Sequence, residues 1–238
     1  MAQPPLAPPQ MVVDSRMLYT SWMPADPEAA AALLPAGVPA AGPVYMNQYV
    51  VDRDEQTSGF GAYSLTYLGL DIAGMMDPEG VLPARYMLFY MNSSERMREY
   101  TIREYDLPAV PAETTVEVEG GRVVATCHLD GRPLIRTAAA IGSGIAMVAR
   151  GQLTYVREKD GRQMAGNFPY IADLADGFEV RSIEFLDPSH PVYALRPADP
   201  LDVVAAHSFF SPRDSFVYPG GVYEVTLWKT AEEVARTG

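Results

Sequence analysis

The chain has 238 residues, of which 48% are hydrophobic and 20% charged, as in an ordinary globular protein. Its net charge of −12 and isoelectric point near 4.6 exclude a basic nucleic-acid-binding surface and argue against binding to anionic membranes. A single cysteine, Cys127, excludes an internal disulfide and indicates a reducing compartment such as the cytoplasm, and with only three histidines it disfavours a zinc site.

Residues 1–14 are rich in proline and lack the basic and long apolar regions of a signal peptide. We expect a flexible N-terminal arm over these residues, followed by one domain over residues 15–238. No stretch approaches the roughly 18 apolar residues of a membrane-spanning helix. We therefore expect no membrane partner.

The first half of the chain predicts strands over residues 17–22, 43–52, 61–74 and 84–92, from alternating or continuously apolar runs. Two short helices interrupt them. The first begins after the N-cap Asp26, has Pro27 in its first turn, and ends at Leu34 before Pro35. The second covers residues 93–106, with Ser93 or Ser94 as its cap.

The second half of the chain is dominated by β signals. The stretches EGGR, LDGR and KDGR predict tight hairpin turns between alternating runs, and a frayed helix is expected over residues 230–238. In total we expect about nine or ten strands and two short helices. The predicted fold class is mainly β (α+β), with antiparallel strands packed as a sheet or closed barrel.

Several motifs occur in an order that resembles the acetoacetate decarboxylase superfamily. They are SRMLYTSW with ADPEAAAALLP, then SGFGAYS, REYDLPAVP, GGRVVATCHLDGRPLIR and DPLDVVAAHSFFSPRDSFVYPGGVYEV. The resemblance covers residues 16–225. It implies an antiparallel β-barrel or cone around a pocket that excludes solvent, and a homo-oligomer.

The resemblance also implies an imine-forming lysine beside a second lysine that lowers its pKa, because a like charge and a dry pocket disfavour the ammonium form. In the family both lysines follow a proline, whereas this chain has Ala109 and Val110 after Pro108. The chain contains only Lys159, in a polar hairpin, and Lys229, near its end. The imine machinery is therefore expected to be absent.

Four residues are candidate catalytic groups. Arg16 matches the family's arginine, and it either anchors a substrate carboxylate or enolate oxygen or forms a surface ion pair. Glu104 is either a general acid or base or a structural carboxylate. Tyr63 and Gln48 either hold a developing oxyanion or are ordinary strand residues, and Gln48 stands where the family has an acidic residue.

The candidate substrate-binding residues share a position on strands expected around the pocket. His128 is either an inward-facing proton shuttle or a surface residue, and His207 leaves the same alternatives. Leu65 replaces a second acidic residue of the family and favours a more hydrophobic pocket. The substrate-binding set is Leu65, Tyr86, Tyr90, Ala109, Val110 and His128.

These features predict a small-molecule enzyme that has kept the fold and replaced the imine chemistry. We expect cyclisation, isomerisation or dehydration of a hydrophobic, polyketide-like carbonyl compound in natural-product biosynthesis. Three alternatives remain open: a binding protein for a hydrophobic small molecule, a lyase that uses Lys159 or Lys229, and a vestigial protein whose cavity is filled. No phosphate-binding loop or dinucleotide motif is present, so we expect no cofactor.

Overall fold

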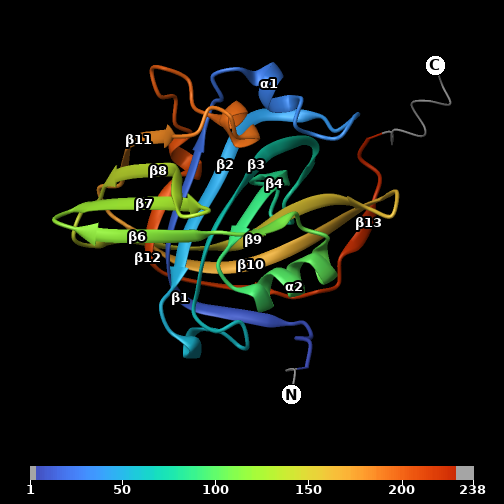
Figure 1. Cartoon of the computed structure of the whole chain (residues 1–238), viewed down its shortest axis with the longest axis horizontal. Helices are drawn as coiled ribbons and strands as arrows, with labels where there is room; N and C mark the ends of the chain where they lie inside the picture. The colour runs from blue at the N-terminus through green and yellow to red at the C-terminus, as the bar shows by residue number, and fades with distance from the viewer. Residues whose placement is uncertain (1–3, 229–238) are drawn as a thin grey trace.

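The computed structural model describes residues 4–228, and two β-sheets account for most of them (Figure 1). The large sheet has nine strands: β1 (Gln10–Trp22), β2 (Ala40–Val51), β3 (Tyr63–Met76), β4 (Pro83–Asn92), β5 (Ala109–Pro111), β9 (Ile145–Lys159), β10 (Arg162–Ala175), β12 (Phe209–Tyr218) and β13 (Tyr223–Val225). The small sheet has the strand order β11–β8–β7–β6, with β6 (Glu113–Glu119), β7 (Arg122–Leu129), β8 (Arg132–Ala140) and β11 (Glu179–Phe185).

The large sheet closes on itself as a hydrogen-bonded ring. Its order is β12–β1–β2–β3–β4–β9–β10, and β10 pairs again with β12. All pairings are antiparallel except the short parallel contacts of β4 with β9 and with β5. The mainly β fold with a few short helices is confirmed, and the expected antiparallel barrel is corrected to a mixed ring at these two contacts.

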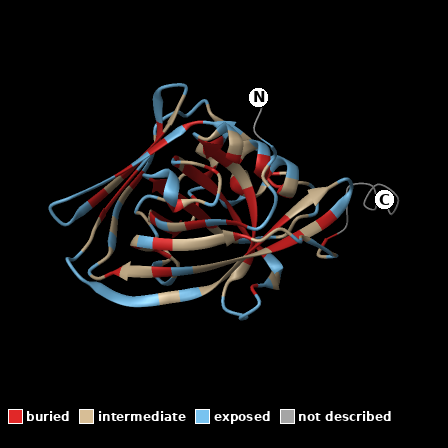
Figure 2. Cartoon of the chain, turned by 90° about the horizontal axis from the view of Figure 1, so that it is seen from below, coloured by how far each residue is buried: buried red, intermediate tan, exposed pale blue. Residues whose placement is uncertain are grey.

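The ring separates two cores, because successive side chains of a strand point to opposite faces. Inside the ring lies a cluster rich in tyrosines. Outside it, aliphatic side chains pack between the ring, the small sheet and the segments around α1. In Figure 2 the buried residues are concentrated in the middle of the molecule. Strands with two buried faces explain the continuously apolar sequences of β2, β3 and β4.

Two α-helices and three 3₁₀ turns complete the described fold. They are α1 (Pro27–Ala31), α2 (Glu95–Tyr105), η1 (Asp54–Gln56), η2 (Pro191–Leu195) and η3 (Ala205–His207). The predicted caps are confirmed, since Asp26 accepts a hydrogen bond from the Ala29 N–H and Ser94 accepts one from the Met97 N–H. The first helix ends at Ala31, earlier than predicted, and the chain continues as turns towards Pro35. No helix within residues 4–228 is long and apolar enough to cross a membrane.

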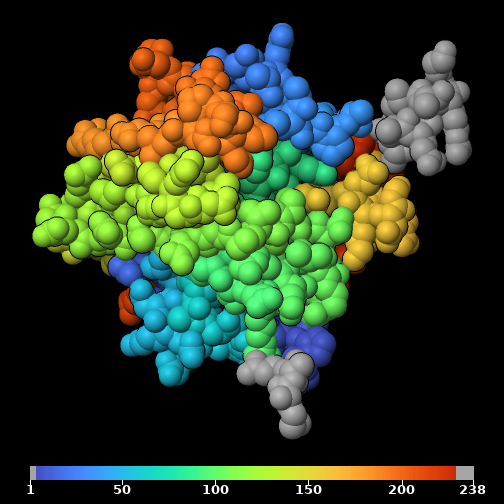
Figure 3. Space-filling model, in the orientation of Figure 1, coloured from blue at the N-terminus to red at the C-terminus, as the bar shows by residue number. Residues whose placement is uncertain are grey.

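The small sheet and α2 form one face of the molecule. In Figure 3 strands β6, β7 and β8 of the small sheet are yellow-green, its fourth strand β11 is orange, and α2 is green. The N-terminal boundary differs from the prediction, because β1 begins at Gln10, inside the expected arm, where Gln10 pairs with Tyr218. The expected helix over residues 230–238 lies outside the described residues. The prediction of a single domain over residues 15–238 stays a prediction.

Candidate functional site

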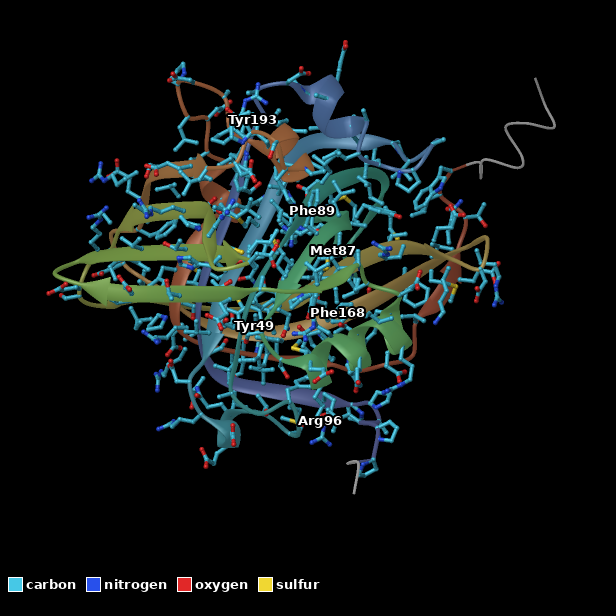
Figure 4. All side chains as sticks on the ribbon, viewed as in Figure 1. Tyr49, Met87, Phe89, Arg96, Phe168 and Tyr193 are labelled. Atoms are coloured by element: carbon cyan, nitrogen blue, oxygen red, sulfur yellow. The ribbon has the colours of Figure 1, made fainter. Side chains whose placement is uncertain are left out.

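A cavity of about 180 Å³ lies inside the ring. Aromatic side chains from most of the ring strands form its walls. Three of the lining residues, Tyr49, Met87 and Phe168, are labelled near the middle of the view in Figure 4. The helix α2 and the β9–β10 hairpin add Glu104, Tyr105 and Lys159. The chain therefore does not fill its own cavity, and the cavity walls combine a large apolar area with a few polar groups.

A buried arginine marks the polar end of the cavity. Arg85 of β4 is 1% exposed, and its Nε lies 3.2 Å from Oδ1 of the equally buried Asp71 on β3. Its guanidinium carbon lies 5.1 Å from the ring centres of both Tyr19 and Tyr45. Nη1 of Arg85 has no hydrogen-bond partner among the described residues. The arginine can therefore donate to a ligand atom.

Ionisation at this end is set by burial and by the Arg85–Asp71 pair. Burial alone lowers the pKa of Arg85, but Tyr19 and Asp71 raise it overall, so the guanidinium stays charged. Burial raises the pKa of Asp71 above its usual value, although Arg85 opposes this shift. The pKa of Asp71 stays raised because one 3.2 Å contact with Arg85 does not fully offset the desolvation of its carboxyl group.

Two tyrosine hydroxyls next to Arg85 are also without partners. The Oη atoms of Tyr19 and Tyr45 are buried and form no hydrogen bond within the described part of the chain. Burial raises the pKa of both hydroxyls well above the usual tyrosine value, so both are neutral donors. A Cβ at Gly69 would lie 2.9 Å from the Tyr45 hydroxyl and would collide with the Tyr86 carbonyl, so this position requires glycine.

Further tyrosines form a hydrogen-bonded network along the cavity. The Tyr67 hydroxyl lies 2.9 Å from both the Asn47 Nδ2 and the Tyr155 hydroxyl. The Tyr49 hydroxyl lies 2.7 Å from that of Tyr63 and 3.2 Å from that of Tyr218. Burial raises the pKa of Tyr218 to about 12. The network therefore consists of neutral hydroxyls at physiological pH.

Two further polar side chains reach the cavity from β12 and the turn before it. Asp214 is 1% exposed, and its Oδ1 forms no hydrogen bond with any described residue. Burial raises the pKa of Asp214 well above its usual value. His207 of η3 also lines the cavity, and its buried Nδ1 is without a partner in residues 4–228.

The structure places the predicted catalytic residues in different environments. Glu104 lines the cavity, and Tyr63 lies behind Tyr49, to which it is hydrogen bonded. Arg16 does not line the cavity. It alternates with the inward-facing Met17, forms an ion pair with Asp52 at 2.8 Å, and donates to the Val116 carbonyl.

Gln48 lies outside the cavity as well. It alternates with Asn47 and Tyr49, which face inwards, and it is fully buried on the side of the small sheet. Neither of its amide atoms has a hydrogen-bond partner in the described structure. The position that matches an acidic residue of the family therefore does not reach this cavity.

The predicted substrate-binding residues are likewise split between the cavity and other parts of the fold. Tyr90 lines the cavity, and Leu65 and Ala109 pack in or against the inner cluster behind its wall. The other three lie elsewhere. Tyr86 faces the outer core, Val110 is 42% exposed, and His128 lies on β7 of the small sheet.

One of the two lysines lies at the mouth of the cavity. The Lys159 Nζ donates to the Arg103 carbonyl at 3.2 Å, next to the ion pair of Arg103 with Glu104 at 2.8 Å. Lys159 lies in the β9–β10 hairpin, as expected, and this hairpin extends to the cavity. Lys229 lies outside the described residues.

Sequence reasoning missed the charged residues of the cavity. Arg85 and Asp71 stand inside the apolar stretches PARYMLFY and LGLDIAG, and a charge in a buried strand was a usable signal. Asp214 lies in SPRDSF, where no pattern indicates which side chain turns inwards. No group of three or more His, Cys, Asp or Glu that could hold a metal ion occurs in residues 4–228.

No protein-family model and no curated protein sequence matches the chain. Solved structures do match. One of acetoacetate decarboxylase has a TM-score of 0.69 and 11% identity, over 92% of this chain and 90% of that chain. The enzyme from Legionella pneumophila gives 0.65 and 11%, over 92% and 88%. The enduracididine biosynthesis enzyme MppR complexed with pyruvate gives 0.64 and 13%, over 94% and 92%. The chain thus has the acetoacetate decarboxylase-like fold that its motifs predicted.

Proposed function

We propose that this chain, which has the fold of acetoacetate decarboxylase, is a small-molecule enzyme of natural-product biosynthesis. It acts without an imine on a hydrophobic, polyketide-like carbonyl compound, by cyclisation, isomerisation or dehydration. The observation that carries the proposal is the Nη1 of Arg85, which has no partner among the described residues, beside the equally unpartnered hydroxyl of Tyr19, both in the wall of an aromatic cavity.

The polar end of the cavity suits an oxygen that gains negative charge. When a ketone loses a proton from the carbon next to its carbonyl group, the electron pair moves onto the carbonyl oxygen and an enolate forms. Arg85 Nη1 and the Tyr19 hydroxyl, both in the cavity wall, can donate to that oxygen. They are held in place before the reaction by strands β1 and β4, and each donor gains strength in a buried site. The same donors fit a substrate carboxylate.

The remainder of the cavity supplies shape and excludes water. Its aromatic walls contact one another edge to face, as in the packing of Tyr49 with Phe216 and of Tyr155 with Phe168. A flexible substrate held against such walls loses the freedom that makes ring closure slow in solution. MppR, a biosynthetic enzyme with a similar fold whose structure contains pyruvate, supports a keto compound as the ligand class.

Proton exchange on a probe ketone tests this function without knowledge of the natural substrate. The protein is incubated in D₂O with phenylpyruvate, and loss of the methylene proton signal is followed by nuclear magnetic resonance, with a protein-free sample subtracted. We expect catalysed exchange, which a binding protein does not produce. The double variant Arg85→Gln/Asp71→Asn removes both charges together, so that neither is left unpaired. We expect it to slow exchange roughly a hundredfold, the effect of losing one oxyanion donor.

Binding measurements separate the role of Arg85 from the fold. Phenylacetone matches phenylpyruvate except for the carboxylate, and we expect it to bind about tenfold more weakly to the wild-type protein. The double variant should bind the two probes equally. Equal binding by the wild-type protein, together with no exchange, would contradict the proposed site.

A lyase that uses Lys159 is the second candidate function, because this lysine lies at the cavity mouth. Borohydride reduction in the presence of keto acids, followed by intact mass measurement, tests it. An adduct on Lys159 that is absent from Lys159→Met would replace the first proposal by imine chemistry. An unmodified protein, beside a lysine-bearing relative that is labelled, supports non-covalent catalysis.

We also propose that the protein is cytoplasmic and forms a homo-oligomer.

A further inference from the structure

We infer that Asp214 is the proton-transfer residue of the cavity: its carboxylate removes the proton next to the substrate carbonyl, and its carboxyl group returns a proton to carbon. This inference rests on the proposed function and names a catalytic group for it. The choice depends on where Asp214 lies, what surrounds it, and what the reaction requires.

Asp214 and Arg85 lie on opposite walls of the ring. Along the ring, β12 and β4 are separated by β1, β2 and β3 on one side and by β10 and β9 on the other. Both side chains line the same cavity. Tyr170 lies on β10, between the two strands, and is close enough to Arg85 and Asp214 for the charge of each to affect its pKa. A ketone whose oxygen contacts Arg85 therefore directs its carbon chain across the cavity towards Asp214.

The Asp214 carboxyl group is isolated from counter-ions. Its Oδ1 has no hydrogen-bond partner within residues 4–228, and burial is the cause of its raised pKa. The neighbouring strands place Ser15 and Ala172 opposite it, and neither residue is charged. The charged groups on these strands are turned elsewhere, since Asp173 pairs with Arg213 at 2.5 Å, Arg16 pairs with Asp52, and Asp14 is exposed. A buried carboxylate with a purely structural role would have hydrogen-bond or ion-pair partners, as Asp173 and Asp52 do.

The proton balance of the step closes within the cavity. Asp214 as a carboxylate takes the proton from carbon, the C–H bond electrons form the C=C bond, and the carbonyl electrons move onto oxygen. The enolate oxygen is held by Arg85 and the Tyr19 hydroxyl. Return of the proton to the same or another carbon gives exchange or isomerisation, and its transfer to a departing hydroxyl gives water. A raised pKa makes Asp214 a stronger base than an exposed aspartate.

Glu104 and His207 also line the cavity and could carry a proton. Glu104 lies at the mouth, where it is held in an ion pair with Arg103 at 2.8 Å, so the remaining alternative is His207. It lies near the polar end, because its charge affects the pKa of Asp71. At that end it is next to the site of the oxygen, whereas the proton to be moved lies on carbon. Asp214, across the cavity, is therefore the better placed base.

The experiment is methylene proton exchange of phenylpyruvate in D₂O by three variants. We expect Asp214→Asn to lower the exchange rate roughly a hundredfold or more, the usual contribution of a positioned base, while the Kd for phenylpyruvate changes little. The control Asp173→Asn breaks the ion pair with Arg213 outside the cavity and should exchange at the wild-type rate. The wild-type rate should rise with pH through the raised pKa of Asp214, and this rise should be missing in Asp214→Asn.

The outcomes distinguish this inference from the function on which it rests. Exchange by the wild-type protein that survives in Asp214→Asn, or that is lost in His207→Gln instead, would overturn the role of Asp214 and leave the proposed function standing. No exchange by the wild-type protein would overturn the proposed function, and the role of Asp214 with it. Loss of exchange together with loss of phenylpyruvate binding in Asp214→Asn would show a structural role and would also overturn the inference.

Discussion

At the scale of single residues, the cavity contains a buried carboxyl group whose Oδ1 has no hydrogen-bond partner in the described structure, that of Asp214. Burial raises the pKa of Asp214 in the folded protein, so the folded protein binds this proton more tightly than the unfolded chain does. Its ionised form therefore opposes folding, and this opposition grows as the pH rises from the unfolded pKa, about 3.9, to the folded value. Such destabilised groups are typical of functional sites.

The unfavourable burial of the ionised Asp214 carboxylate leads to a prediction about stability. Asp214→Asn should unfold at a higher denaturant concentration than the wild-type protein near pH 7, because the amide avoids burial of a charge. The gain should shrink as the pH falls towards about 4, where the wild-type carboxyl group is protonated in the folded protein and about half protonated in the unfolded chain. Urea unfolding at the two pH values measures it. A variant that is less stable than the wild-type protein at both pH values would show that Asp214 has a structural partner.

Gln48 gives a second prediction at the residue scale. Its side chain is completely buried, and both amide atoms are without partners among the described residues. Gln48→Met keeps the length of the side chain and removes the unsatisfied polar atoms, so it should stabilise the protein by about 1–3 kcal/mol. Urea unfolding measures this gain, and phenylpyruvate exchange should persist. Loss of exchange would restore the catalytic role that the sequence suggested for Gln48.

At the scale of elements, α2 connects stability to the cavity. The helix buries Met97 and Tyr100 in the inner core and supplies Glu104 and Tyr105 to the cavity mouth. Its first turn is held by the Ser94 hydroxyl, which accepts from the Met97 N–H and donates to the Phe60 carbonyl. The cap therefore fixes the helix to the loop before β3 as well as closing its first turn.

Removal of this cap should weaken both the fold and the site. Ser94→Ala should lower the free energy of unfolding by about 0.5–2 kcal/mol, as caps of this kind do. Phenylpyruvate should also bind more weakly, because a frayed α2 loosens the cavity mouth. Ser143→Ala is the matched control, since Ser143 is exposed and forms no side-chain hydrogen bond in the described structure. Equal unfolding curves for the two variants would contradict the role of the cap.

The elements were more predictable than the faces of the strands. Hairpin turns and helix caps depend on neighbouring residues, so EGGR, LDGR, Asp26 and Ser94 indicated them directly. The inward face of a strand depends on which side holds the cavity, and both sides of β1 and β2 are buried near it. Arg16 and Gln48 therefore matched a family pattern in sequence and still lie on the outer face. Arg85 and Asp71 were recognisable only as charges inside apolar strands.

At the scale of the whole molecule, the ring leaves part of one strand unpaired. The first half of β9 pairs with β10 on one side, and no pairing is found on its other side before Tyr155 in residues 4–228. Met147 and Val148 point to opposite faces of this strand and are 58% and 56% exposed. An open edge with apolar side chains on both faces is a site for strand pairing with another chain.

A second copy of this chain is the partner that suits such an edge, because antiparallel pairing of the same strand about a two-fold axis satisfies both copies at once. We therefore predict that the 26.0 kDa chain sediments as a dimer or larger oligomer. Val148→Glu should shift it to the monomer, because two-fold pairing of this edge would then bring like charges of the two copies together. Val81→Glu, which changes an exposed valine outside β9, should not. A monomeric wild-type protein would contradict the prediction, and an oligomer unaffected by Val148→Glu would place the interface elsewhere.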